Sequence, residues 1–203
     1  AVVMVRDAHL QGQGDILSRL RRQGATLLPV DRLTEGTICT VMLARRSFAP
    51  DGAVLVANAD QLVDFSVEDF IADAERRDLD GSILVFRDAA RDPKWSFARL
   101  GADGLVAEVR EKVAISDLAT VGIYYFRRAR DLVDATIDMI ARNDRVKGEF
   151  YTCPVYNYLI ANGARVGVFE VPAEAMHGLG TPEDLCEYLA IRHLPASADR
   201  PLA

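Results

Sequence analysis

Hydrophobic and polar positions follow one another along this chain in segments that predict strands alternating with helices. Short apolar runs bounded by turn residues predict strands, and such runs lie at residues 1–5, 25–30, 54–57, 81–86, 121–126 and 165–171. Apolar residues at helical spacing among polar ones predict helices, and these segments lie at residues 15–23, 38–44, 66–77, 131–142 and 153–161. This alternation predicts an α/β fold with a mostly parallel, mixed sheet flanked by helices.

Local start and stop signals refine this outline. Asp103-Gly104 separates the apolar runs 95–100 and 105–109, which predicts an antiparallel hairpin inserted into the sheet. The segment 66–69 has the pattern of a capping box, with aspartate in place of the usual glutamate. Thr181-Pro182 predicts the start of a last helix, because threonine caps helices and proline fits their first turn.

Length and apolar content indicate one globular domain. The chain has 203 residues and half of them are apolar, which is enough for a sizeable core. Since no linker composition interrupts the pattern, residues 1–194 are expected to form a single domain. Residues 195–203 are rich in proline, alanine and serine and are expected to be a flexible tail.

Charge and cysteine content exclude some classes of function. The 30 acidic residues outnumber the 24 basic ones, which argues against a nucleic-acid partner because such proteins need a basic face. No apolar run approaches the roughly 20 residues that span a bilayer, and no signal peptide is visible, so a cytoplasmic protein without a membrane partner is expected. Cys39, Cys153 and Cys186 lack the spacing of a zinc site and are expected to be reduced, mostly buried thiols.

The segment 54–60 is the first place where the pattern indicates chemistry. Val54 to Ala57 reads as a buried strand, and it ends in Asn58, Ala59 and the lone carboxylate of Asp60. Ligands of open α/β sheets bind at the carboxyl ends of strands, where a carboxylate can hold Mg²⁺ against phosphate oxygens. The alternative is that these polar residues only turn the chain.

Four segments in order carry a family resemblance. The first is Glu35-Gly36-Thr37-Ile38-Cys39-Thr40 and the second is Val54 to Asp60. The third is Val109-Arg110-Glu111-Lys112, shortly before Gly122-Ile123-Tyr124, and the fourth runs from Gly148 to Glu183. In order and spacing, these segments resemble the sugar nucleotidylyltransferase family, whose members join a nucleoside triphosphate to a sugar phosphate.

This resemblance implies a Rossmann-like, GT-A-like fold and a nucleotidyltransferase reaction. A nucleoside monophosphate would pass from a triphosphate to a sugar phosphate or similar small phosphorylated acceptor, with release of pyrophosphate. The resemblance implies that Asp60 binds a catalytic Mg²⁺ and that Lys112 binds the acceptor's phosphate. The substrate-binding residues that it implies are Glu35, Gly36, Thr37, Asn58, Ala59, Glu111, Gly122, Glu149 and Tyr151. Whether the protein forms a homo-oligomer is left open by the sequence.

The sequence also departs from the family pattern. The family's Gly-rich triphosphate loop is absent, so the chain is expected to begin after the first strand and helix of the fold. The strand at residues 2–5 is accordingly expected to have an unfilled position beside it. Gly178 stands where many members have a second magnesium carboxylate. The segment 150–156 is closer to a branch associated with capsule biosynthesis, which implies precursor synthesis for surface polysaccharide and leaves a non-sugar acceptor open.

The sequence leaves two functions other than nucleotidyl transfer open. A glycosyltransferase of related fold would need a DxD pair, whereas Asn58-Ala59-Asp60 offers one carboxylate. A non-catalytic domain that senses nucleotides or sugars would keep the fold without the loop. Lys112 beside Glu111 also suits a solvated surface pair, and Trp95 is better explained by hairpin packing than by base stacking.

Overall fold

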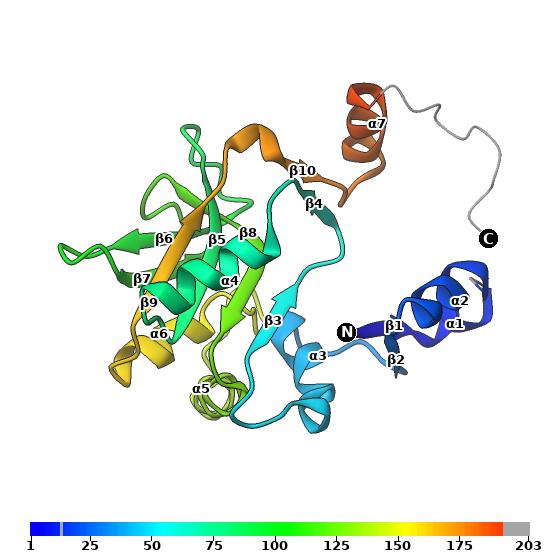
Figure 1. The fold of residues 1–203 in the computed structure, drawn as a ribbon, viewed down its shortest axis with the longest axis horizontal. Coiled ribbons are helices and arrows are strands. Elements are labelled where there is room, and N and C mark those ends of the chain that lie inside the picture. Colours follow the sequence, from blue (N-terminus) through cyan, green and yellow to red (C-terminus); the bar gives the residue numbers. More distant parts are fainter. Residues whose placement is uncertain (13, 193–203) are drawn as a thin grey trace.

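The computed structural model of the chain describes residues 1–12 and 14–192 (Figure 1). The expected tail at 195–203 and the end of the expected domain at residue 194 lie outside the described residues. The helices are α1 (Asp7–Gly12), α2 (Gly14–Arg22), α3 (Thr37–Leu43), α4 (Val67–Arg76), α5 (Ala129–Ala141), α6 (Val155–Ala161) and α7 (Pro182–Ile191). Two 3₁₀ turns are η1 (Arg45–Ser47) and η2 (Ala173–Ala175). The strands are β1 (Val2–Arg6), β2 (Thr26–Val30), β3 (Val54–Ala57), β4 (Gln61–Val63), β5 (Gly81–Arg87), β6 (Ser96–Leu100), β7 (Val106–Glu111), β8 (Leu118–Phe126), β9 (Val166–Glu170) and β10 (Met176–Gly178).

The main sheet is mixed, as the hydrophobic pattern predicts. Its order is β7-β6-β8-β5-β9, and β3 also pairs with β8. Among the described strands of this sheet, only β5 and β9 pair in parallel, so the expected excess of parallel pairs is wrong. The reason is the position of β8, which runs antiparallel to β3, β5 and β6 and therefore separates strands that run in the same direction.

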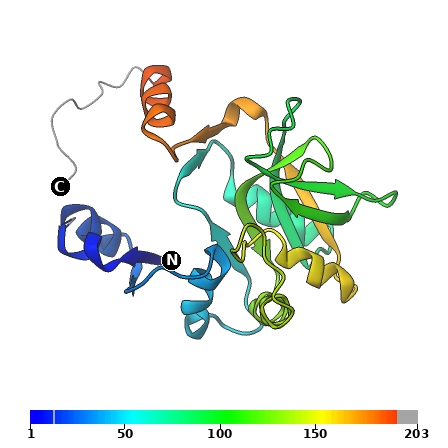
Figure 2. The ribbon, with the colours of Figure 1, turned by 180° about the vertical axis from the view of Figure 1, so that it is seen from behind.

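Two apolar clusters cover the two faces of this sheet. Ile83 and Val85 of β5 face a cluster completed by α3, α5 and α6, whereas Leu84 and Phe86 face a cluster completed by α4. This alternation follows from the two-residue period of a strand. Figures 1 and 2 show α4 on one side of the sheet and α5 with α6 on the other. The sheet is thus buried on both faces, and a ligand site is expected at one of its ends.

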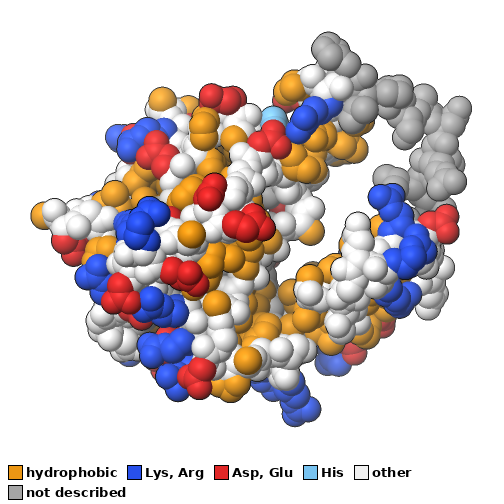
Figure 3. All heavy atoms as spheres, viewed as in Figure 1, with side chains coloured by type: hydrophobic (Ala, Val, Ile, Leu, Met, Phe, Trp, Pro, Cys, Tyr) orange, Lys and Arg blue, Asp and Glu red, His pale blue; other side chains and the backbone are white. Residues whose placement is uncertain are grey.

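The strands β1 and β2 form a separate parallel pair that carries α1 and α2. Among the described residues, β2 is the only partner of β1 and β8 is the only partner of β3. Consequently β3 is not the buried strand that its apolar run predicts, since Val56 is buried but Leu55 is 38% exposed. Figure 3 shows an open gap with hydrophobic side chains along it. The gap is bordered by the unit of β1, β2, α1 and α2, by the part of the chain that contains the main sheet, and by α7.

The local signals in the sequence are confirmed where they can be checked. The Ser66 side chain accepts a 3.0 Å hydrogen bond from the Asp69 amide at the start of α4, which is one of the two bonds of the expected capping box. Thr181 and Asp184 form a capping box at the start of α7. The predicted hairpin is β6 and β7, joined by the turn at residues 101–104. Cys39 is half-buried, Cys153 buried and Cys186 exposed, so the expectation of buried thiols fails for the last of these.

Candidate active site

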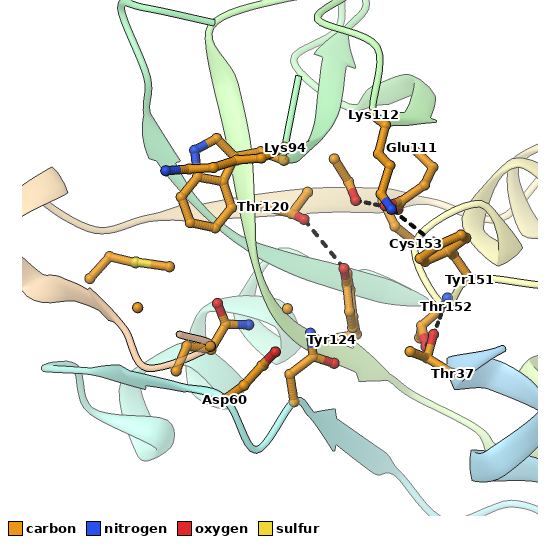
Figure 4. Close-up of a pocket in the computed structure, with 18 of the residues that line it drawn as sticks. Thr37, Asp60, Lys94, Glu111, Lys112, Thr120, Tyr124, Tyr151, Thr152 and Cys153 are labelled. Atoms are coloured by element: carbon orange, nitrogen blue, oxygen red, sulfur yellow. Dashed lines mark hydrogen bonds between the residues drawn. The ribbon is translucent and has the colours of Figure 1, made fainter. Parts of the chain in front are cut away.

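A cavity of about 570 Å³ opens at one end of the main sheet. Its walls come from the turn after β3, the adjoining ends of β6 and β7, the middle of β8, the segment before α6 and the segment from η2 to α7. Figure 4 shows Lys94 and Lys112 on two sides of the cavity, with Thr120 and Tyr124 between them and Asp60 across from them. Segments far apart in the sequence therefore meet in one place, as expected for a binding site.

Lys112 follows β7 directly and reaches the cavity with an unusual backbone. Its φ of 57° lies in the left-handed region, which a residue with a side chain adopts at some cost. Its amide donates a 3.1 Å hydrogen bond to the Trp95 carbonyl, which holds this conformation. The ammonium donates a 2.8 Å hydrogen bond to the Tyr151 hydroxyl, and this bond raises the pKa of the Lys112 ammonium. The cavity thus contains a fixed positive charge at neutral pH.

Glu111 is the buried carboxyl of the cavity, with only 7% of the residue exposed. It pairs with Ser96 across the hairpin, and the Ser96 hydroxyl donates a hydrogen bond to the Glu111 carboxylate. Burial raises the pKa of the Glu111 carboxyl, and this effect outweighs the hydrogen bond from Ser96 and the charge of Lys112. Such a carboxylate is a strong acceptor for a hydroxyl that enters the cavity, because water competes little there.

Gly122 permits the close packing of the cavity floor. Its φ is 73°, and a Cβ there would lie 2.0 Å from Gln61 Nε2 and 2.5 Å from Asn58 Nδ2. The Asn58 amide donates a 3.0 Å hydrogen bond to the Gly122 carbonyl, which ties the end of β3 to β8. A glycine is therefore required both by the backbone and by the two side chains that cross it.

Asp60 lies in the turn between β3 and β4 and is exposed to the cavity. Its carbonyl accepts a 2.8 Å hydrogen bond from the Leu179 amide, which brings the segment before α7 alongside it. A Cβ on Gly180 would lie 3.8 Å from Asp60 Oδ2 and 4.0 Å from Asp184 Oδ2, so both carboxylates border the same small space. Two carboxylates with open space between them suit Mg²⁺, which takes its other ligands from phosphate and water.

No group of three or more His, Cys, Asp or Glu residues within residues 1–12 and 14–192 is arranged to hold a metal ion. A site built from the protein alone is therefore not what this cavity offers. A cation that shares its coordination shell with substrate phosphates is compatible with the two carboxylates, because Mg²⁺ is commonly bound through one or two carboxylates plus phosphates.

The start of α3 meets the segment before α6 at the side of the cavity. The Thr37 hydroxyl lies 3.1 Å from the Thr152 hydroxyl and also accepts a 3.2 Å hydrogen bond from the Thr152 amide. Tyr151 precedes this contact and lines the cavity beside Lys112. The structure thus brings seven of the residues implied by the resemblance to one cavity, namely Thr37, Asn58, Asp60, Glu111, Lys112, Gly122 and Tyr151.

The other four implied residues do not line this cavity. Gly36 packs on the backbone of Phe150, where a Cβ would lie 2.2 Å from the Phe150 carbonyl oxygen. Glu35 is exposed and forms an ion pair with Arg145. Ala59 and Glu149 are exposed, and the charge of Glu149 contributes to the raised pKa of Lys112. These residues border the site without forming its wall.

No family model and no curated protein matches the chain. Among solved structures, a nucleoside-diphosphate-sugar pyrophosphorylase from Vibrio cholerae RC9 is similar at 25% identity with a TM-score of 0.79, over 93% of this chain and 80% of that one. This chain therefore has the fold of the sugar nucleotidylyltransferases. A Bacillus anthracis structure with bound sucrose, assigned as a glucose-1-phosphate thymidylyltransferase, is 16% identical with a TM-score of 0.70, over 100% and 77% of the two chains, and supports the fold alone.

This fold supports a nucleotidyltransferase as the general kind of protein. The structure also adds site residues that the sequence did not indicate. Lys94, Ser96, Thr120, Tyr124 and Asp184 all line the cavity. Asp184 carries no sequence signal beyond its place in the first turn of the helix that Thr181-Pro182 predicts. For Ser96, Thr120 and Tyr124 the signal is alternation along β6 and β8, but it becomes useful only when the end of the sheet that holds the cavity is known. Lys94 lies in the loop before β6 and carries no such signal.

Proposed function

We propose that the chain transfers a nucleoside monophosphate from a nucleoside triphosphate to a small phosphorylated acceptor. A phosphate oxygen of the acceptor attacks the α-phosphorus, the bond between that phosphorus and the bridging oxygen breaks, and pyrophosphate leaves. The observation that carries this proposal is the presence of the Asp60 carboxylate and the Lys112 ammonium in the wall of one cavity. Phosphoryl transfer depends on such charge placement and on alignment more than on a protein nucleophile.

The residues of the cavity divide into two groups by their chemistry. Lys112 binds the attacking phosphate as a point charge, and Tyr151 orients the ammonium through its 2.8 Å contact. Glu111 accepts a hydrogen bond from a hydroxyl of the acceptor. Asp60, with Asp184 beside it, would hold Mg²⁺, which neutralises developing charge on phosphate oxygens when it is bound.

The neighbouring residues complete the proposed site on the nucleotide side. Gly36 and Thr37 begin α3, and we assign them with Glu35 to the side that faces the base and ribose. Asn58 and Ala59 precede Asp60 and are assigned to the phosphate side, with Gly122 below them. Glu149 is assigned to the acceptor. Thr37 supports this arrangement because its hydroxyl is fixed to Thr152 within the cavity wall.

The finer parts of the proposal rest on the sequence resemblance. The acceptor is a sugar phosphate or a similar small phosphate, and the product is an activated precursor for surface polysaccharide. The reaction is assigned to the cytoplasm, where nucleoside triphosphates are made. Among the described residues, no helix combines the length and the apolar character that crossing a membrane requires.

Phosphorus NMR of a reaction mixture tests the function directly. The protein is incubated with Mg²⁺, each of the common nucleoside triphosphates and a panel of sugar 1-phosphates. Pyrophosphate and a new diphosphate diester are expected with the wild type and not with Asp60→Asn. Release of nucleoside diphosphate from a sugar nucleotide would instead indicate a glycosyltransferase. Tight nucleotide binding without any turnover would indicate a sensing domain and would contradict the proposal.

A further inference from the structure

Lys94 and Trp95 form a part of the cavity wall that the proposed chemistry does not use. Both line the cavity where β6 begins. The Trp95 carbonyl accepts the 3.1 Å hydrogen bond from the Lys112 amide, and the next residue, Ser96, pairs with Glu111. The tryptophan is therefore fixed by the backbone to the two residues that we assign to the acceptor.

The Trp95 ring is packed on one side and open to the cavity on another. Phe86 meets it edge to face, with ring centroids 5.4 Å apart and an interplanar angle of 88°. Trp95 and Met176 both pack against the apolar cluster on the α4 side, and Met176 also lines the cavity. Since Trp95 is only half-buried, the cavity has an apolar, aromatic wall beside a polar floor. Aromatic rings of this kind offer a large, rigid contact surface.

Lys94 gives this wall a positive charge. Its ammonium lies 4.9 Å from the centroid of the Trp95 ring, which is the position a bound cation would take on an aromatic face. The nearest acidic partner is Asp92 at 3.5 Å, and the Lys94 side chain remains 61% exposed. An acceptor with a cationic end group would meet this ammonium in addition to Lys112. Like charges in one cavity disfavour such a ligand.

We infer that Trp95 and Lys94 determine acceptor specificity: the acceptor's uncharged body packs on Trp95, and Lys94 rejects acceptors that carry an ammonium group. This inference rests on the proposed function, because it assumes that the phosphate of the acceptor lies at Lys112. The acidic side chains of the cavity do not reverse the selection. Asp60 and Asp184 border the space at Gly180, and the charge of the Glu111 carboxylate is offset by the neighbouring Lys112 ammonium.

The single tryptophan of the chain makes the inference measurable without turnover. Fluorescence and calorimetric titrations use glucose 1-phosphate, ribitol 5-phosphate, phosphocholine and inorganic phosphate as probes. Glucose 1-phosphate and ribitol 5-phosphate, whose bodies are uncharged apart from the phosphate, are expected to change Trp95 fluorescence. They should bind at least about tenfold more tightly than phosphocholine. This ratio corresponds to about 1.4 kcal/mol.

Variants separate the roles of the two side chains. Trp95→Ala should weaken the binding of glucose 1-phosphate and ribitol 5-phosphate about tenfold and leave the affinity for inorganic phosphate unchanged. Lys94→Gln should tighten phosphocholine binding roughly threefold or more, with little effect on glucose 1-phosphate. Arg142→Gln is the matched control, because Arg142 lies 5.8 Å from the Tyr158 ring centroid and neither residue lines the cavity. This control should change neither affinity.

The results distinguish the inference from the function on which it rests. Equal binding of phosphocholine by the wild type, an unchanged affinity in Trp95→Ala, or no binding of any acceptor overturns the inference. Nucleotidyl transfer to phosphocholine at the rate seen with glucose 1-phosphate would also overturn it while leaving the proposed function intact. Binding that depends on Trp95 without any transfer would overturn the proposed function and leave the specificity of the cavity standing.

Discussion

The Lys112 ammonium donates a 2.8 Å hydrogen bond to the Tyr151 hydroxyl and lies 4.7 Å from the centroid of the same ring. One side chain thus fixes the lysine both by its hydroxyl and by its π face, although 38 residues separate the two positions in the sequence. Because a lysine side chain has many rotamers, this double contact reduces the entropy that phosphate binding would otherwise cost. The pair supports a preorganised phosphate site.

Replacement of Lys112 should therefore affect the acceptor more than the nucleotide. Lys112→Ala is expected to lower kcat/KM for the acceptor. The loss of transition-state stabilisation should be about 2–4 kcal/mol, as when a charged contact is truncated. Tyr151→Phe keeps the ring, so the same transition-state stabilisation should fall by only about 1 kcal/mol. Steady-state kinetics with each substrate varied in turn provide the measurement.

Lys147→Ala is the matched control for Lys112→Ala. Lys147 is also a lysine with positive φ, at 50°, but it is exposed and does not line the cavity. Both alanine variants therefore carry the same backbone strain. An equal loss of activity in the two variants would show that Lys112 acts through folding rather than through its charge.

Glu111 should make stability depend on pH in a direction opposite to that of an ordinary ion pair. Burial raises its folded-state pKa above the unfolded value, so between these two pKa values the folded state binds more protons. Stability from this group is present below the unfolded pKa, about 4.3, and is lost as the pH rises through the folded pKa. Glu111→Gln should therefore raise Tm at neutral pH and have little effect at acidic pH.

Glu108→Gln on the same strand provides a control of opposite sign. Hydrogen bonds from Arg99 and Arg110 lower the pKa of the Glu108 carboxyl, so its contribution is present at neutral pH and lost on acidification. Thermal melts across the pH range compare the two variants with the wild type. Glu111→Gln should also weaken the acceptor about tenfold to a hundredfold, since it replaces a charged acceptor by a neutral one. Parallel Tm curves for Glu111→Gln and the wild type would contradict the buried, raised-pKa state.

Gly122 and Gly104 separate backbone strain from steric crowding. Both have positive φ, at 73° and 75°, but a Cβ on Gly104 meets nothing within 4 Å, whereas one on Gly122 overlaps Gln61 and Asn58. Gly104→Ala is expected to lose about 1 kcal/mol of unfolding free energy. Gly122→Ala should lose about 2–4 kcal/mol and should also lower activity, because it displaces the cavity floor. Urea unfolding would contradict this account if the two losses were equal.

Local features of the fold were predictable because they depend on neighbours in sequence. The Ser66 cap, the Thr181 capping box and the hairpin around Asp103-Gly104 follow from the chemistry of a few adjacent residues. The direction of β8 was not predictable, since an apolar run carries no information about the partner it will meet. For the same reason, Val54 to Ala57 read as a buried strand but lies at an edge of the described sheet.

The candidate site was predictable only in part. Asp60 and Lys112 were singled out by the family-like segments that contain them, and both line the cavity. Asp184 and Lys94 carry no such signal, because a helix-capping aspartate and a loop lysine are common on any protein surface. Only folding shows that Asp184 borders the same space as Asp60 and that Lys94 lies over Trp95.

Asp60 is the residue on which the proposed reaction depends most. Asp60→Asn keeps the shape of the side chain but removes the charge that would attract Mg²⁺. Turnover is expected to fall by at least about a hundredfold, as when charge stabilisation in phosphoryl transfer is lost. Unfolding should change little, because Asp60 is exposed in a turn and its link to Leu179 uses the backbone carbonyl.

A second readout separates metal binding from catalysis. Mn²⁺ titrations followed by electron paramagnetic resonance, in the presence of nucleoside triphosphate, should show weaker binding in Asp60→Asn and a smaller effect in Asp184→Asn. The smaller effect is expected because the Asp184 carboxylate also accepts a 2.9 Å hydrogen bond from the Thr181 amide, which holds it toward the helix. Asp134→Asn removes the same charge from the exposed face of α5 and should change neither turnover nor Mn²⁺ affinity. A structural role for Asp60 would produce the reverse pattern, in which Tm falls while the folded variant keeps normal activity and normal Mn²⁺ affinity.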